Sequence, residues 1–270
     1  MINDPKIFDR FLNILEVKAA EPSLELLKKI IKSHMEKIPF ENISKLIYKR
    51  RGANDIPGFV KYLDEVENNN FGGTCYSLNY YLYLLLRYLG FNVKLCGADM
   101  QLPDVHLLSI VEIDYTEYIV DCGYGAPFIE PLPRNISCDY EIIFGDEKYI
   151  LKSKNADGTS RLEQYYKNEL KHYYTVKPQA RKLSEFKKVI NNSYADDALF
   201  MNNLLITRHS EEYSISLRNF TLTVIKNNKL TQRQVELNEI PGVVNTYFGI
   251  PAMLVKNAIF RLRSLNSPDE

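Results

Sequence analysis

Cys75 is the residue of this sequence best placed to act as a nucleophile. It follows Gly72 and Gly73 and opens the segment 75–89, whose apolar pattern predicts a helix that ends at Gly90. A helix N-terminus presents free backbone N–H groups and the positive end of the helix dipole, which favour a reactive thiolate and can hold an oxyanion. A buried structural cysteine explains the same pattern equally well.

His106 is the histidine best placed to activate such a cysteine. It precedes the β-rich runs 107–113 and 116–122, which are separated by two residues and therefore predict a hairpin. In that register Asp121 is the diagonal neighbour of His106 on the same face, about 7–8 Å away at the backbone. Cys, His and Asp together form the triad of thiol enzymes. An aspartate that only caps the following turn is the alternative.

The remaining histidines and cysteines suggest no second centre. His34 lies on an apolar helical face and is expected in the core, whereas His172 and His209 stand among polar residues and are expected at the surface. No Cys-x-x-Cys pair or zinc-ligand spacing is present, so we expect free thiols, most of them buried, and no metal. The sequence contains four cysteines: Cys75, Cys96, Cys122 and Cys138.

The charge balance argues against a nucleic-acid-binding protein. The 270 residues include 34 Lys+Arg and 34 Asp+Glu, so the formal net charge is zero. No signal-peptide pattern opens the sequence, and the longest apolar stretch, 80–86, is too short to span a membrane. We therefore expect a cytoplasmic protein that binds neither nucleic acid nor a membrane. We interpret the basic run Lys45, Lys49, Arg50 and Arg51 as the solvated flank of a loop.

The hydrophobic period changes along the chain. Helical spacing predominates up to about residue 90, short strands follow, and the last part mixes strands with helical segments at 242–248 and 251–263. Close-spaced short strands predict a small sheet or barrel. Helices followed by strands and then by a mixed unit favour an α+β fold over a doubly wound sheet.

Several ordered motifs occur along the sequence. They are Ile38–Ile43, with its Pro-Phe-Glu-Asn core, then Gly72–Asn79, His106–Leu108, Val120–Gly125, Asp197–Arg208 and Phe248–Ile250. In this order and spacing the chain resembles the arylamine N-acetyltransferase family. The resemblance spans about residues 7–260 and is therefore much more specific than any single motif.

The resemblance implies a fold and an activity. The fold is an N-terminal helical bundle (1–90), a central β-barrel (91–190) and a C-terminal α/β lid (191–270), with a cysteine-protease-like catalytic core. The activity is ping-pong transfer of an acetyl group from acetyl-CoA to an arylamine, an arylhydrazine or an N-hydroxyarylamine. Cys75 would be the nucleophile, His106 the base and Asp121 its orienting group. The implied acceptor pocket is lined by three aromatic residues: Phe40, Tyr124 and Phe200.

The sequence departs from the family pattern close to the nucleophile. Phe71 stands where the family has an arginine that pairs with the glutamate of Pro-Phe-Glu-Asn, so Glu41 is expected to lack its partner. Thr74 replaces an aromatic residue, and Tyr124 replaces a phenylalanine. These changes bear on substrate range and rate more than on reaction type, because all three triad residues are retained.

Two other functions compete with acetyl transfer. Transglutaminases and thiol peptidases share the order Cys, His, Asp, and would act on peptides without coenzyme A. A catalytically degenerate member of the family, kept as a binding protein, is the second alternative and is favoured by the loss of the arginine at Phe71.

Overall fold

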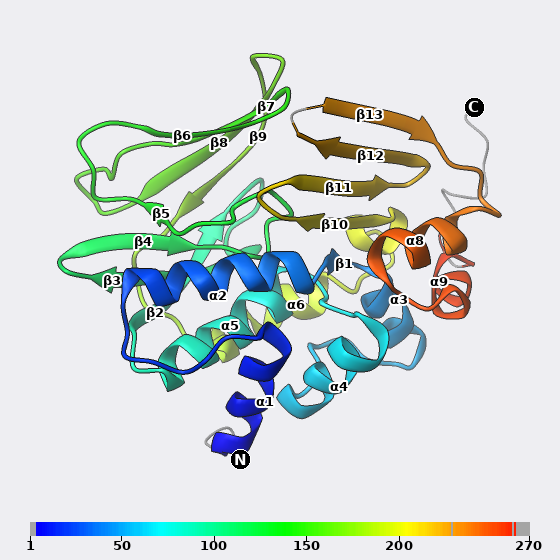
Figure 1. Ribbon diagram of the computed structural model, residues 1–270, viewed down its shortest axis with the longest axis horizontal. Coiled ribbons are helices and arrows are strands. Elements are labelled where there is room, and N and C mark those ends of the chain that lie inside the picture. Colours follow the sequence, from blue (N-terminus) through cyan, green and yellow to red (C-terminus); the bar gives the residue numbers. More distant parts are fainter. Residues whose placement is uncertain (1–3, 228, 261, 263–270) are drawn as a thin grey trace.

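The computed structural model describes residues 4–227, 229–260 and 262. Figure 1 shows two sheets with the helices of the first 90 residues gathered along one side of them. One sheet has eight strands and curves into a nearly closed barrel, and the other has five. The α+β class and the barrel expected from the sequence are confirmed.

The N-terminal helices begin where their capping residues predict. The Asp4 side chain accepts a bond from the Lys6 N–H, and Ser23 does the same for the Leu26 N–H. The segment after Asn42 was not predicted as a helix, yet it forms α3 and buries Lys45. The interpretation of Lys45 as part of a solvated loop is therefore wrong. The helices are α1 (Pro5–Leu15), α2 (Leu24–Lys37), α3 (Ile43–Arg50), α4 (Phe59–Asn69) and α5 (Cys75–Tyr88).

The barrel strands follow in antiparallel order. The hairpin β3–β4 has the predicted register, with Ser109 opposite Val120, and its two loop residues, Asp114 and Tyr115, have φ values of 49° and 62°. The sheet order is β5-β4-β3-β2-β9-β8-β7-β6. The strands are β2 (Asn92–Asp99), β3 (His106–Ile113), β4 (Thr116–Val120), β5 (Leu132–Pro133), β6 (Tyr140–Phe144), β7 (Glu147–Leu151), β8 (Ser160–Tyr166) and β9 (Glu169–Val176).

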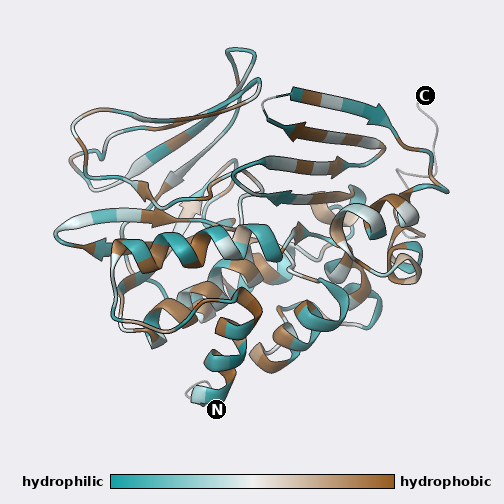
Figure 2. Ribbon diagram, viewed as in Figure 1, coloured by the Kyte–Doolittle hydropathy of each residue, from teal (hydrophilic) through white to brown (hydrophobic). Residues whose placement is uncertain are grey.

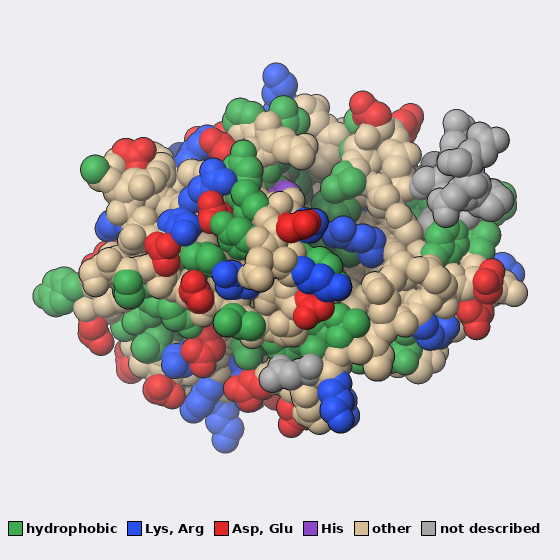
Figure 3. Space-filling view, turned by 90° about the horizontal axis from the view of Figure 1, so that it is seen from above, with side chains coloured by type: hydrophobic (Ala, Val, Ile, Leu, Met, Phe, Trp, Pro, Cys, Tyr) green, Lys and Arg blue, Asp and Glu red, His purple; other side chains and the backbone are tan. Residues whose placement is uncertain are grey.

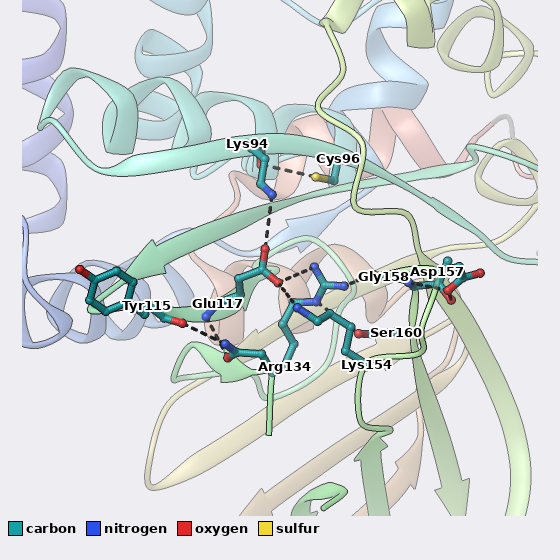
Figure 4. A network of polar contacts seen from close by, with 11 residues as sticks. Lys94, Cys96, Tyr115, Glu117, Arg134, Lys154, Asp157, Gly158 and Ser160 are labelled. Carbon is teal, nitrogen blue, oxygen red and sulfur yellow. Dashed lines mark hydrogen bonds and ion pairs between the residues drawn. The ribbon is translucent and has the colours of Figure 1, made fainter. Parts of the chain in front are cut away.

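A buried arginine holds the far end of this hairpin against the barrel (Figure 4). Arg134 is fully buried and donates to Glu117 on β4 at 3.3 Å, to the Ser160 hydroxyl at 3.2 Å and to the Gly158 carbonyl. Glu117 also pairs with Lys154 at 3.1 Å. Because a buried guanidinium is costly without partners, this network fixes β4 relative to the strands around β8.

The C-terminal part forms the second sheet and covers one end of the molecule. The short strand β1 (Phe40–Glu41) pairs with β10, with Phe40 opposite Thr207, so the first part of the chain supplies the edge of this sheet. The division of the chain into three parts at residues 90 and 190, which the family resemblance implies, stays a proposal. The elements are η1 (Leu183–Phe186), α6 (Lys187–Asn192), α7 (Leu199–Asn202), β10 (Leu205–His209), β11 (Tyr213–Arg218), β12 (Thr221–Lys226), β13 (Lys229–Gln234), α8 (Ile240–Phe248) and α9 (Ala252–Ile259). The predicted end of the last helix at residue 263 lies outside the described residues.

The apolar side chains form separate clusters beneath and within the sheets. Figure 2 shows apolar stripes on the helices, and these stripes face the interior in α1, α2 and α4. On the face seen in Figure 3, acidic and basic side chains are interspersed with apolar ones. In the described part of the chain, no helix has both the length and the apolar character needed to cross a membrane. The four cysteines are free thiols, and Cys138 is exposed rather than buried.

The burial of His34 in the core should make the free energy of unfolding depend on pH. It is fully buried on α2, and both of its ring nitrogens lack a hydrogen-bond partner among the described residues. Burial lowers the pKa of His34 to about 3, whereas an unfolded histidine titrates near about 6.5. Between these values the unfolded chain binds one more proton, so the free energy of unfolding falls as the pH is lowered, by about 1.4 kcal/mol per pH unit.

We predict that His34→Leu removes this slope between about pH 6.5 and pH 4. The measurement is urea unfolding at a series of pH values. Lys29→Leu, on an exposed position of the same helix, is the matched control and should keep the wild-type slope. An unchanged slope in His34→Leu would show that His34 takes up its proton without unfolding.

Candidate active site

Cys75 is held at the first position of α5, between two close approaches of the backbone. Gly73 has φ +82°, a conformation that other residues rarely adopt. On the other side, a Cβ at Gly123 would lie 2.6 Å from the Cys75 Cα, so only glycine lets the end of β4 pack here. Cys75 is 6% exposed. The thiol is therefore nearly enclosed at the positive end of a helix.

Three buried side chains form a continuous set of contacts at this point. The His106 ring bonds through Nε2 to the Asp121 Oδ2 at 2.8 Å, and the Cys75 side chain lies close enough to raise the pKa of the same ring. His106 is 2% exposed and Asp121 is 3% exposed. Since Nε2 faces the carboxylate, Nδ1 is the nitrogen left for the thiol. The structure thus brings Cys75 of α5 together with His106 and Asp121, the two residues that the predicted hairpin places on one face.

Asp121 accepts four hydrogen bonds. Its Oδ2 receives the Tyr174 hydroxyl at 2.9 Å in addition to the His106 ring, and its Oδ1 receives the Asn79 amide at 2.8 Å and the Gly123 N–H at 3.1 Å. A buried carboxylate with this many donors stays ionised. It can therefore hold one orientation and one tautomer of the imidazole.

The titration of the two partners agrees with this geometry. Burial lowers the pKa of His106, but the Asp121 carboxylate and the Cys75 side chain raise it further, to about 10. Burial raises the pKa of Asp121, yet His106, Asn79 and Tyr174 together bring it below its usual value. At neutral pH the pair is an imidazolium beside a carboxylate.

Asn79 connects the nucleophile helix to the hairpin. It lies four residues after Cys75, on the same face of α5. Its amide also donates to the Leu107 carbonyl at 2.7 Å, and its Oδ1 accepts the Cys122 N–H at 2.9 Å. Asn79 therefore positions α5 against both β3 and the end of β4. The signal in the sequence is an Asn four residues after Cys75.

Glu41 keeps several hydrogen-bond partners although position 71 is not an arginine. It is fully buried, and its carboxyl accepts the Gly73 N–H at 2.7 Å, the Ser44 N–H at 2.8 Å and the Ser44 hydroxyl at 2.6 Å. Burial raises the pKa of Glu41, while these donors lower it in part. Glu41 is thus without the arginine partner of the family, and backbone and hydroxyl donors take that place.

Phe71 belongs to an apolar cluster instead of to the active site. It is buried among Ile43, Ile47, Val244 and Phe248, which come from α3 and α8. The side chain thus joins the loop before Cys75 to the C-terminal part of the chain. The contacts among Cys75, His106 and Asp121 do not involve Phe71.

The three predicted pocket aromatics separate into two places. Phe40 and Phe200 pack edge to face, with ring centroids 5.6 Å apart. Tyr124 instead packs beside His106, with centroids 6.0 Å apart, and its hydroxyl lies 2.7 Å from the His172 Nδ1. The structure therefore places Tyr124 next to the triad, while Phe40 and Phe200 form a separate pair.

Two histidines differ from their predicted environment. His172 is half-buried against Tyr124, and burial lowers its pKa. His209 is buried, with its ring nitrogens near the Ser214 hydroxyl and the Gly125 carbonyl. Sequence reasoning also missed Tyr174 of β9, which has no local motif. Among the described residues no group of three or more His, Cys, Asp or Glu side chains is arranged to hold a metal.

We predict that Asn79→Ala destabilises the protein and slows alkylation of Cys75. The change removes one donor from Asp121 and leaves the Leu107 carbonyl and the Cys122 N–H without their partner, at a cost of about 2–5 kcal/mol. Urea unfolding and the iodoacetamide rate measure the two effects. Asn68→Ala, at an exposed position of α4, should change stability by less than about 0.5 kcal/mol. If both variants had equal effects, Asn79 would have no special role in positioning the active site.

Comparisons with known proteins are consistent with this site. A family model described as N-acetyltransferase matches residues 23–257. The chain is 27% identical over 238 residues to the arylamine N-acetyltransferase pineal gland isozyme NAT-3 of Gallus gallus, covering 77% of this chain and 79% of that protein. It is 28% identical over 183 residues to proansamycin X synthase of Amycolatopsis mediterranei, covering 63% of this chain and 66% of that protein.

The fold agrees with a solved structure over nearly the full length. The arylamine N-acetyltransferase from Mycobacterium abscessus matches with a TM-score of 0.79 at 16% identity, and the match covers 97% of this chain and 95% of that one. The structural likeness shows the fold, and the family model spans most of the chain. This protein therefore belongs to the arylamine N-acetyltransferase family and is an acyltransferase.

Proposed function

We propose that this protein transfers an acetyl group from acetyl-CoA to the nitrogen of an arylamine or arylhydrazine, or to the oxygen of an N-hydroxyarylamine. The observation that carries the proposal is the buried set of contacts from Cys75 through His106 to Asp121. Such a set activates a thiol for acyl transfer. Membership of the family supports acetyl-CoA as the donor and an aromatic amine as the acceptor.

The first half of the reaction acetylates Cys75. The thiolate attacks the carbonyl carbon of the acetyl-CoA thioester and forms a tetrahedral intermediate. N–H groups at the start of α5 are suited to stabilise its oxyanion. The carbon–sulfur bond to coenzyme A then breaks, and the leaving thiolate takes the proton from the His106 imidazolium. Acetyl-Cys75, neutral His106 and free coenzyme A result.

The second half returns the enzyme to its starting state. The acceptor nitrogen attacks the carbonyl carbon of acetyl-Cys75, and neutral His106 takes a proton from that nitrogen. The bond between the carbonyl carbon and Sγ breaks, which releases the amide and restores the thiolate beside the imidazolium. Asp121 keeps the ring orientation constant through both halves, because its other donors come from Asn79, Tyr174 and Gly123.

The aromatic side chains suit a flat acceptor. We propose that Tyr124, whose ring lies beside His106, forms one wall of the acceptor site, and that Phe40 and Phe200 form another. Aromatic walls bind a planar amine by ring contacts. The cytoplasmic location and the absence of nucleic-acid and membrane partners stay predictions.

The decisive experiment is a single-turnover mixture of protein and acetyl-CoA, analysed by intact mass and peptide mapping. We expect one acetyl group on Cys75, abolished in Cys75→Ser. Cys138→Ala, which removes the exposed cysteine, is the matched control and should be acetylated normally.

Addition of an arylamine should discharge the acetyl group and yield the amide. A peptidase or transglutaminase would instead turn over a peptide without coenzyme A. A degenerate binding protein would leave Cys75 unacetylated and no more reactive to iodoacetamide than an ordinary thiol. Either result would overturn the proposed function.

Tyr124→Phe tests the acceptor site. The change removes the hydroxyl that contacts His172 at 2.7 Å and makes the wall more apolar. We predict that kcat/KM for an unsubstituted arylamine rises about two- to tenfold, and that an arylamine with a hydrogen-bonding substituent gains less. Tyr173→Phe, at an exposed position of β9, should change neither value. Equal changes for both acceptors in Tyr124→Phe would show that the hydroxyl does not contribute to acceptor choice.

A further inference from the structure

Lys45 is a buried cation close to the nucleophile that the triad does not include. It lies on α3 and is 4% exposed. Its Nζ donates to the Ser193 hydroxyl at 2.5 Å and lies 4.4 Å from the centre of the Tyr194 ring. No carboxylate of the described residues pairs with it. A buried ammonium with one hydroxyl partner is costly, so its retention requires a compensating charge.

The surroundings of Lys45 and of Cys75 are continuous. The Nζ lies 5.8 Å from the centre of the Tyr76 ring, and Tyr76 directly follows Cys75. Cys75, Tyr76 and Tyr194 pack in one cluster. A narrow cavity, with room for about one water molecule, is lined by Lys45, Gly73, Thr74 and Tyr76. The ammonium therefore lies beside the residues that precede and follow Cys75 in the chain, Gly73, Thr74 and Tyr76.

Electrostatic interaction links the two groups. Burial lowers the pKa of Lys45 to about 8, and a negative charge at Cys75 raises it. The interaction free energy is the same for both groups. The ammonium of Lys45 therefore stabilises a thiolate at Cys75 by as much as the thiolate stabilises the ammonium. Attraction between unit charges is strong in such a volume because little water screens it.

The other charges and titratable groups around Lys45 do not supply this compensation. Burial raises the pKa of Glu41, whose oxygens are occupied by Gly73 and Ser44. Burial also raises the pKa values of the neighbouring tyrosines above their usual range, so they stay neutral. Among the titratable groups nearby, His106 interacts with Cys75. The acidic groups Glu41, Asp55, Glu65 and Asp104 act on the tyrosines Tyr48, Tyr76 and Tyr194 around Lys45.

We propose that Lys45 is a second cation, besides His106, that stabilises the Cys75 thiolate. The inference rests on the proposed nucleophilic role of Cys75, and it does not depend on which acyl group Cys75 carries. It makes Lys45 a positioning residue whose charge acts on the reacting atom. When Cys75 is acylated the thiolate charge disappears, so Lys45 loses its compensating anion and binds its proton less tightly.

The test is the pH dependence of Cys75 alkylation by iodoacetamide in the full-length protein, with Cys138→Ala as the background. Lys45→Met removes the charge and keeps an unbranched apolar side chain. We expect the pH of half-maximal rate to rise by about one unit, so that alkylation below that pH becomes about tenfold slower. Lys45→Arg keeps the charge and should restore a profile close to that of the wild type.

Lys49→Met is the matched control on the same helix. Lys49 donates to the Tyr194 carbonyl at 2.7 Å and pairs with Asp196 at 3.0 Å, and its loss should leave the profile unchanged. If Lys45→Met does not fold, Lys45→Gln takes its place, because its amide can retain the bond to Ser193. The ultraviolet absorbance of the thiolate, measured against a matching Cys75→Ser protein, gives the same midpoint without a reagent.

Two results would overturn the proposal. One is an unchanged midpoint in a folded, neutral variant of Lys45. The other is an equal rise in Lys45→Met and Lys45→Arg, which would assign the effect to packing. Neither result depends on acetyl-CoA. If Cys75 is not acetylated, only the proposed function is contradicted. If the alkylation profiles do not differ, only the role of Lys45 is contradicted.

Discussion

The burial of the Asp121 carboxylate is the constraint on which the rest of the active site depends. A carboxylate without water needs donors from the protein, and Asp121 receives them from α5, β3, β9 and the turn after β4. These elements are distant in sequence, so the helical part and the barrel must pack in one arrangement for the charge to be stabilised. The orientation of His106 is then a consequence of that packing.

Glu41 is a second buried carboxyl group near Cys75, and the hydrogen bonds that it accepts also hold separate parts of the chain together. Glu41 accepts the N–H of Gly73 and of Ser44, and so fixes the loop before Cys75 relative to α3. Cys75 thus lies between two buried carboxyl groups whose hydrogen-bond donors hold the surrounding elements in place. The loss of the family arginine at Phe71 is compatible with this arrangement, because the glutamate is held by backbone groups and the phenylalanine completes an apolar cluster.

The parts of the site that the sequence predicted are those set by local geometry. A two-residue turn determines the register of β3 and β4, and this placed Asp121 beside His106. Tyr174 could not be predicted in the same way, because its contact with Asp121 arises from strand order in the barrel. Lys45 was assigned to a solvated loop since its partners, Ser193 and Tyr194, are about 150 residues away.

The pairing of β1 with β10 has a consequence for how this protein can be divided. Cys75, His106 and Asp121 all precede residue 191, yet Phe40 and Glu41 of β1 pair with Thr207 and Ile206 of β10. A chain shortened before β10 would contain the whole triad and would leave the strand beside Glu41 as an unpaired edge. Exchange of C-terminal segments between relatives would therefore succeed only where the incoming strand matches β1, so the two ends of this chain are expected to evolve together.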